Sequence, residues 1–300
     1  MARGHQEDKG MPDIIQLTPQ GYCGGVKSAI EKVLTYRKEH PEEQMTVLGN
    51  LVHNRHVKAM LEEQGITVLE DPKKNRLALL DQIDSGTVVF TAHGVSDEVR
   101  QKAKEKGLKT LDASCPFVLS TQKIVKSKGR EGYSVLYIGK KGHPEAEASV
   151  AGNEHVYLIE TKKDIPKDLS GPIFVTNQTT MSVLDLKDLF DRILEVYPQA
   201  EIHDEICSAT RLRQQAVLNL KNDLPDLLIV VGDPASNNTR KLEEVARSIG
   251  IENVWRIESV RALEGKPLIK GSIAITSGAS TPASLKDEVV DYLSRHPNDD

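Results

Sequence analysis

The sequence predicts an α/β protein of three similar modules with mostly parallel sheets, arranged about a pseudo-threefold axis around a central cavity. Its three cysteines are evenly spaced, and each follows a short strand-like run and precedes a helix-like stretch. Strands and helices alternate along the chain without a long linker between them. Several of the strands are apolar throughout, as expected for strands covered on both faces of a parallel sheet.

The first module is expected to span residues 11–115, after a polar tail at residues 1–10. Apolar residues recur at helical spacing from Gly24 to His40, which predicts a helix, and the proline that follows His40 ends it. Strands are expected at residues 14–17, 45–49, 66–69, 87–91 and 108–112, and further helices up to Gln64, around residues 77–83 and from Ser96.

The second module is expected at residues 116–206 and the third at 207–282, followed by a C-terminal helix and tail at 283–300. Pro116 suits the first turn of the helix that follows the second cysteine. Strands are expected at residues 134–139, 173–176, 201–206, 227–232 and 272–276, and helices at residues 116–130, 182–196 and 208–222 and up to Arg295.

Composition limits what the chain can bind. With 300 residues, 38% of them hydrophobic and 28% charged, the chain is an ordinary globular protein. A net charge of −5 gives no overall positive charge for nucleic acid, so no nucleic-acid partner is expected. The sequence contains no run of about 18 apolar residues that would predict a membrane span, and no apolar export signal follows the first polar residues. We therefore expect a cytoplasmic protein without a membrane partner.

The three cysteines, Cys23, Cys115 and Cys207, are candidate metal ligands. A free cysteine often only fills space in a core, so each one alone could be inert. An odd number of cysteines without a Cys-x-x-Cys motif argues against a disulfide framework. Their equal spacing favours three thiolates that converge on a metal centre with an open position. Two centres fit: zinc with a fourth ligand from His or water, or an iron–sulfur cluster with one iron left free.

Polar residues follow several of the other predicted strands. The loops carry His53, His93, His143, Ser236, Asn238 and Ser280. A single histidine in such a loop is more often structural, but near helix amino termini these groups together offer donors to a phosphate or diphosphate. The glycines at residues 21–25 match neither a Walker loop nor a dinucleotide fingerprint, which argues against ATP and NAD.

Glu145 is the carboxylate of this polar set that is placed for proton transfer. It follows His143 and Pro144 directly, and a positioned acid contributes typically about 10²–10⁴-fold to a rate. A carboxylate in the first turn of a helix is also stabilised by the macrodipole without any catalytic role. Position alone does not favour either interpretation.

The motifs together point to one family. They are Gly21-Tyr22-Cys23-Gly24-Gly25-Val26, Val52-His53-Asn54, Thr91-Ala92-His93-Gly94-Val95-Ser96, Asp112-Ala113-Ser114-Cys115-Pro116, Gly142-His143-Pro144-Glu145, Gln178-Thr179-Thr180, Ile206-Cys207, Ser236-Asn237-Asn238 and Gly278-Ala279-Ser280. From about Ile14 to Leu293 the chain resembles the 4-hydroxy-3-methylbut-2-enyl diphosphate reductases, the last enzymes of the non-mevalonate isoprenoid pathway. The resemblance implies an oxidoreductase that removes the C4 hydroxyl of (E)-4-hydroxy-3-methylbut-2-enyl diphosphate with two electrons and two protons. Its products would be isopentenyl and dimethylallyl diphosphate.

The resemblance also implies a cofactor, residue roles and a partner. A 4Fe-4S cluster would be held by Cys23, Cys115 and Cys207. Glu145 would relay the proton, and Thr179 would orient the hydroxyl, with His143 beside them in the catalytic group. The substrate-binding residues would be His53, His93, His143, Thr179, Ser236, Asn237, Asn238 and Ser280. Ferredoxin or flavodoxin would supply the electrons.

Some positions depart from the family's pattern, and two other functions compete with it. The departures are Ser114, Ala148, residues 118–122 and residues 239–241, none of them a predicted ligand. The helix after Cys115 borders the expected cluster, so a divergent paralogue could differ in rate or partner. Quinolinate synthase has a similar threefold architecture and three cluster cysteines, but the loops around His143 and Thr179 fit it less well. A non-catalytic iron–sulfur sensor would need neither the diphosphate site nor the proton relay.

Overall fold

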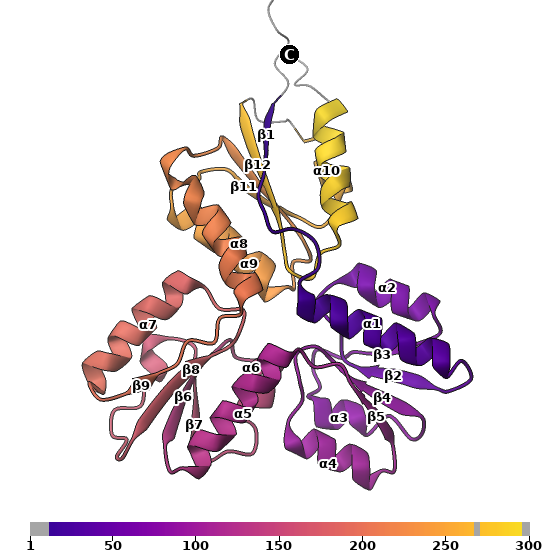
Figure 1. Ribbon diagram of the computed structural model, residues 1–300, viewed down its shortest axis with the longest axis vertical. Helices are drawn as coiled ribbons and strands as arrows, with labels where there is room; N and C mark the ends of the chain where they lie inside the picture. The colour runs from indigo at the N-terminus through magenta and orange to yellow at the C-terminus, as the bar shows by residue number, and fades with distance from the viewer. Residues whose placement is uncertain (1–11, 267–270, 296–300) are drawn as a thin grey trace, which may run out of the picture. The chain divides into compact units, whose positions relative to one another are not determined.

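The computed structural model describes residues 12–266 and 271–295, and the expected polar tail at residues 1–10 lies outside them. The described chain forms three parallel four-stranded sheets covered by helices (Figure 1), which confirms the predicted α/β modules. Their arrangement about a pseudo-threefold axis stays a prediction. The chain divides into two compact units, Cys23–Arg211 with two of the sheets, and Met1–Tyr22 together with Leu212–Asp300 with the third.

The first sheet of unit Cys23–Arg211 has the strand order β3-β2-β4-β5. Its strands are β2 (Met45–Leu48), β3 (Thr67–Leu69), β4 (Thr87–Phe90) and β5 (Lys109–Asp112), and its helices are α1 (Gly24–Glu39), α2 (Arg55–Glu63), α3 (Arg76–Leu80) and α4 (Asp97–Glu105). Figure 1 shows α1 and α2 on one side of this sheet and α3 and α4 on the other. Both central strands are buried along their whole length, as their apolar sequences predict.

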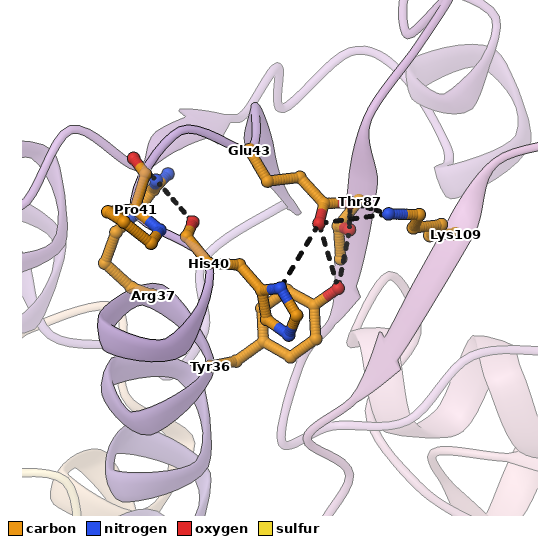
Figure 2. Close-up of polar contacts among 7 residues, drawn as sticks. All are labelled: Tyr36, Arg37, His40, Pro41, Glu43, Thr87 and Lys109. Carbon is orange, nitrogen blue, oxygen red and sulfur yellow. Dashed lines mark hydrogen bonds and ion pairs between the residues drawn. The ribbon is translucent and has the colours of Figure 1, made fainter.

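A polar cluster fixes α1 to the amino-terminal end of this sheet (Figure 2). The Tyr36 hydroxyl, near the end of α1, donates to Glu43 Oε2 (3.3 Å). The Glu43 carboxylate also accepts hydrogen bonds from Thr87 Oγ1 at the start of β4 (2.5 Å) and from Lys109 Nζ at the start of β5 (3.2 Å). These contacts lower the pKa of Glu43. Because the end of α1 is held here, its beginning, next to Cys23, lies toward the carboxyl ends of the strands.

The second sheet of the same unit has the order β7-β6-β8-β9. Its strands are β6 (Ser134–Ile138), β7 (Val156–Ile159), β8 (Ile173–Asn177) and β9 (Glu201–Ile202), and its helices are α5 (Pro116–Arg130), α6 (Pro144–Val150), α7 (Val183–Val196) and the 3₁₀ turn η1 (Lys162–Asp164). Figure 1 shows α7 on one side and α5 and α6 on the other. Leu136 and Ile138 pack in the core on the α7 side, and Val135 and Tyr137 in the core on the α5 side.

Strand β9 is shorter than expected, and the prediction of a strand over residues 201–206 is wrong beyond Ile202. Side chains take over the backbone donors of this segment. Asn177 Oδ1 accepts from the Glu205 amide (3.0 Å), and Asp204 Oδ1 accepts from the amide two residues on (2.9 Å). The segment that leads to the third cysteine is therefore a loop positioned by side chains.

The third sheet belongs to the other unit and has the order β1-β12-β10-β11. Its strands are β1 (Asp13–Gln16), β10 (Leu227–Val231), β11 (Val254–Ile257) and β12 (Ser272–Ser277), and its helices are α8 (Ser208–Leu218), α9 (Asn237–Ser248), α10 (Ala283–Arg295) and the 3₁₀ turns η2 (Asn219–Asn222) and η3 (Val260–Leu263). Figure 1 shows α8 and α9 on one side and α10 on the other. The expected first module, residues 11–115, includes β1 with the strands that follow it; in the structure β1 pairs with β12, with Ile15 opposite Ala274.

Every strand pair in the three sheets is parallel, so within each sheet the loops after the strands lie at one edge. The candidate histidines and polar residues lie in these loops or at the first residues of the helices that follow. Among residues 12–266 and 271–295, no helix is long and apolar enough to cross a membrane.

Candidate active site

Each of the three cysteines stands directly before a helix. Cys23 and Cys115 are the N-cap residues of α1 and α5, and Cys207 precedes α8. All three are free and partly exposed. Gly25, in the first turn of α1, lies against the second cysteine, because a Cβ atom at Gly25 would be 2.5 Å from Cys115 Sγ. The start of α1 therefore approaches this sulfur at a distance that only glycine allows.

The three thiols also act on one another electrostatically. Burial raises the pKa of Cys115, amides at the start of α5 oppose this, and the neighbouring Cys23 and Cys207 raise it further. Burial likewise raises the pKa of Cys207, whose Sγ lies 3.2 Å from Thr210 Oγ1. These raised pKa values favour the protonated thiols. A bound metal cation would favour the thiolates instead, because thiolates are the ligand form of cysteine.

The donor set fits an iron–sulfur cluster better than a single zinc ion. The three sulfurs lie in the loops that follow β1, β5 and β9, and each stands at a helix amino terminus, which favours a thiolate. Ligands of one zinc ion must all lie within about 2.0–2.3 Å of it. Among the described residues, the set of three ligand atoms close enough to share one ion consists of histidines and not of these cysteines. The three cysteine sulfurs are not such a set, and thiolates are the usual ligands of an iron–sulfur cluster.

Three histidines meet at the carboxyl ends of the two sheets in unit Cys23–Arg211. The ring centroids of His53 and His93 are 4.4 Å apart, and His143 lies 5.3 and 5.4 Å from them. Their ligand-capable nitrogens all lie within 4.8 Å of one another. Burial lowers the pKa of His93 well below its ordinary value, and the charges of His53, His143 and Arg76 lower it further. His93 is therefore neutral at pH 7.

The local fold sets the proton position on His143. This residue is the N-cap of α6, and its Nδ1 accepts a hydrogen bond from the Glu145 amide (3.2 Å). The neutral ring therefore carries its proton on Nε2 and is a donor there. Imidazole N–H groups of this kind suit the oxygens of a phosphate. The spacing of the three rings would also suit a transition metal ion.

Glu145 is a buried acid that is held by hydrogen bonds from Thr179. It lies in the first turn of α6 with 1% of its surface exposed. Its Oε1 accepts from the Thr179 amide (2.7 Å), and its Oε2 accepts from the Thr179 hydroxyl (3.0 Å). Burial raises the pKa of Glu145 to about 7, against the opposing effect of these hydrogen bonds. The Thr179 carbonyl in turn accepts from the Cys207 amide (3.2 Å), which links this acid to a cysteine.

The remaining candidate residues form a group within the other unit. All are buried: Ser236, Asn237, Asn238 and Ser280. Ser236 is the N-cap of α9, and its Oγ accepts from the Thr239 amide (3.3 Å). Asn238 Oδ1 accepts from the Ala279 amide (2.9 Å). This bond joins the start of α9 to the loop after β12, which carries Ser280.

Several known proteins are similar to this chain in sequence and in fold. A family model described as LytB protein matches residues 14–294. The chain is 46% identical over 289 residues to the 4-hydroxy-3-methylbut-2-enyl diphosphate reductase of Macrococcus caseolyticus, covering 94% of this chain and 88% of the relative. It is 47% identical over 291 residues to the enzyme of the same name from Bacillus cytotoxicus, covering 94% and 90%. The chain belongs to the LytB family of 4-hydroxy-3-methylbut-2-enyl diphosphate reductases. The resemblance drawn from its motifs is thereby confirmed.

Solved structures of LytB-family reductases have the same fold. The reductase from Plasmodium falciparum superposes with a TM-score of 0.83 at 28% identity, covering 94% of this chain and 88% of that one. A reductase described as the terminal enzyme of the non-mevalonate pathway gives a TM-score of 0.65 at 28% identity, covering 95% and 100%. These likenesses confirm the three-module α/β fold expected for the family.

The sequence did not predict one charged residue that lies near the histidines. Arg76 begins α3, and its charge acts on His93. A signal was present, because a cation in the first turn of a helix opposes the macrodipole and therefore needs another reason to be there. Gln122, in the segment where the sequence departs from the family's pattern, is also buried beside the His93 loop. A Cβ atom at Gly94 would lie 2.7 Å from Gln122 Nε2.

Proposed function

We propose that this chain reduces (E)-4-hydroxy-3-methylbut-2-enyl diphosphate. Two electrons and two protons remove the C4 hydroxyl as water and leave isopentenyl or dimethylallyl diphosphate. The observation that carries the proposal is the buried Glu145, whose pKa of about 7 allows it to hold a proton at neutral pH. Its partner Thr179 accepts a hydrogen bond from the Cys207 amide, so the acid is connected to a proposed cluster ligand.

The cofactor in this proposal is a 4Fe-4S cluster held by Cys23, Cys115 and Cys207. When bound, it supplies the electrons of the reduction and an iron with an open position for the hydroxyl oxygen. Support comes from the free state of the three thiols, their mutual effect on pKa and the close approach of Gly25 to Cys115. The start of each following helix favours the thiolate form.

The chain's own residues would bind and orient the diphosphate. In unit Cys23–Arg211 the donors are His53, His93 and His143, with His143 donating through Nε2. In the other unit the donors are Ser236, Asn237, Asn238 and Ser280, which are hydroxyl and amide groups at the start of α9 and after β12. Hydrogen bonds to a charged group contribute about 1.5–3 kcal/mol each, so each of the two groups of donors would add to the binding of a diphosphate.

Glu145 would deliver a proton to the reacting end of the substrate. At pH 7 a carboxyl with a pKa of about 7 is protonated in about half of the molecules. The Thr179 amide and hydroxyl hold both carboxyl oxygens, which fixes the direction of the acid. In the same proposal Thr179 orients the substrate hydroxyl, and His143, which accepts from the Glu145 amide, positions the start of α6.

The electrons would come from a ferredoxin or flavodoxin, because two electrons must enter from outside the chain for each substrate reduced. We propose a cytoplasmic location, since three free thiols persist in a reducing compartment.

An anaerobic turnover assay tests the proposal. Iron-loaded protein, the hydroxylated diphosphate and reduced methyl viologen should give two molecules of oxidised dye per molecule of product. A non-catalytic sensor would bind iron and leave the dye reduced, and a quinolinate synthase would leave the diphosphate unchanged. Absence of substrate-dependent dye oxidation in protein that carries its full iron content would exclude the reductase.

A further inference from the structure

Arg76 is a cation whose hydrogen bonds are incomplete. Its Nη2 lies 3.4 Å from Thr91 Oγ1, while its Nη1 is buried without a hydrogen-bond partner among residues 12–266 and 271–295. Burial lowers the pKa of Arg76 to about 10, against the opposing charges of Glu147 and Glu70, so the side chain is still charged at pH 7. A guanidinium offers five N–H donors, and leaving one buried and unused is costly.

No carboxylate neutralises this charge directly. Among the described residues, none lies within ion-pairing distance of Arg76. Glu70 is engaged elsewhere, since it accepts from Asn50 Nδ2 (2.5 Å) and lies 3.6 Å from Lys58 Nζ. The chain has nevertheless made room for the guanidinium, because a Cβ atom at Gly49 would lie 2.0 Å from Arg76 Nη1. The position is therefore built, and Glu147 and Glu70 act on the guanidinium only from beyond ion-pairing distance.

This charge lies among the strand ends that carry the histidines. Thr91, which contacts the guanidinium, is two residues before His93, and Gly49 directly follows β2, four residues before His53. The Nδ1 atom of His93 is itself buried without a hydrogen-bond partner among the described residues. Two buried donors or acceptors at one place, one of them on a cation, mark a site completed by an anionic ligand.

We propose that Arg76 supplies the positive charge with which the three-histidine cluster binds a phosphoryl group, and that this charge makes the cluster an anion site instead of a transition-metal site. The inference rests on the proposed function and adds a binding residue to it. Neutral imidazoles alone donate hydrogen bonds but bring no net charge, and their 4.8 Å spacing also suits zinc. A neighbouring guanidinium attracts a diphosphate and repels a divalent cation by the same Coulomb interaction.

Three variants and one simple probe test this assignment. Arg76→Gln removes the charge, Arg76→Lys keeps it without the planar fork, and Lys73→Gln removes an equal charge from an exposed position nearby. Binding of inorganic pyrophosphate to the anaerobic, iron-loaded protein is measured by calorimetry, and KM and kcat for the hydroxylated diphosphate are measured beside it. For Arg76→Gln we expect the pyrophosphate Kd and the KM to rise roughly 10- to 100-fold, with kcat changed much less.

The controls separate binding from folding. Arg76→Lys should fall between wild type and Arg76→Gln in Kd, and Lys73→Gln should match wild type. Zinc should inhibit Arg76→Gln at a lower concentration than wild type, and pyrophosphate should relieve that inhibition less. If Arg76→Gln does not fold, Arg76→Met serves as a second neutral variant, and an unchanged Kd and KM in it overturns the assignment.

The outcomes also distinguish this inference from the proposed function. Wild type that binds pyrophosphate while Arg76→Gln binds it equally well overturns the role of Arg76 and leaves the reductase intact. Wild type that binds neither pyrophosphate nor the hydroxylated diphosphate overturns both. A parallel loss of kcat and thermal stability in Arg76→Gln and Arg76→Lys, without a change in Kd, would show a structural role only.

Discussion

Replacing Glu145 by Gln separates its proposed chemistry from its place in the fold. Gln keeps the size of the side chain and can still accept from the Thr179 amide, but it cannot donate an acidic proton. We expect kcat to fall roughly 10²–10⁴-fold, while the Kd for the diphosphate changes only slightly. In wild type, kcat should fall as pH rises through about 7, because ionised Glu145 has no proton to give. The variant should lack this limb of the pH profile.

The same substitution should stabilise the fold at neutral and higher pH. The pKa of Glu145 is raised on folding from 4.5 to about 7, so the native state binds this proton more tightly than the unfolded state. Stability from this group is fully present below pH 4.5 and is lost as pH rises through 7. The loss amounts to roughly 3 kcal/mol when the buried carboxyl is ionised. Gln carries no such penalty.

Urea unfolding of the iron-free chain at pH 5 and pH 8 measures this difference. Glu145→Gln should be more stable than wild type at pH 8, by up to roughly 3 kcal/mol, and the gap should shrink toward pH 5. Thr179→Val serves as a matched control, because it removes one hydrogen bond to Glu145 and leaves the acid in place. A Glu145→Gln variant with wild-type kcat and a wild-type pH profile would refute the proton-donor role.

Three further outcomes follow from the geometry. Changing any one of the three cysteines to Ser should lower bound iron and sulfide per chain and abolish turnover; full iron content in such a variant would remove that residue from the ligand set. Gly25→Ala places a Cβ atom 2.5 Å from Cys115 Sγ, so iron retention after anaerobic gel filtration should drop, and retention equal to wild type would contradict the close approach. The double variant Ser236→Ala with Asn238→Ala should raise KM roughly 10-fold or more with a smaller effect on kcat, since it removes donors to a charged group; steady-state kinetics with an unchanged KM would exclude both residues from the diphosphate site.

Much of the fold could be predicted because the apolar pattern is strong. Uninterrupted apolar runs such as residues 227–231 are buried along their whole length in the structure, as a parallel sheet requires. The partner of β1 could not be predicted, because its short apolar run suits any parallel edge and pairing with β12 joins opposite ends of the chain. The end of β9 could not be predicted either, since the side chains of Asn177 and Asp204 accept the backbone hydrogen bonds that a neighbouring strand would otherwise accept.

The candidate site was predictable where residue type and spacing agree. His53, His93 and His143 each follow a strand, and the structure brings their rings together. Arg76 escaped prediction because its importance lies in what it lacks, a carboxylate partner, and only three-dimensional contacts reveal that. The raised pKa of Glu145 likewise depends on burial by distant segments, which no local pattern encodes.

Reduction in heavy water tests directly whether this chain removes the C4 hydroxyl and delivers a proton to carbon. Iron-loaded protein, reduced methyl viologen as the electron source and the hydroxylated diphosphate are mixed in D₂O, and the products are analysed by mass spectrometry. We expect isopentenyl and dimethylallyl diphosphate that each carry one carbon-bound deuterium, because one of the two protons is delivered to carbon and the other leaves in water. Recovery of unchanged substrate from protein with its full iron content would contradict the proposed reductase activity.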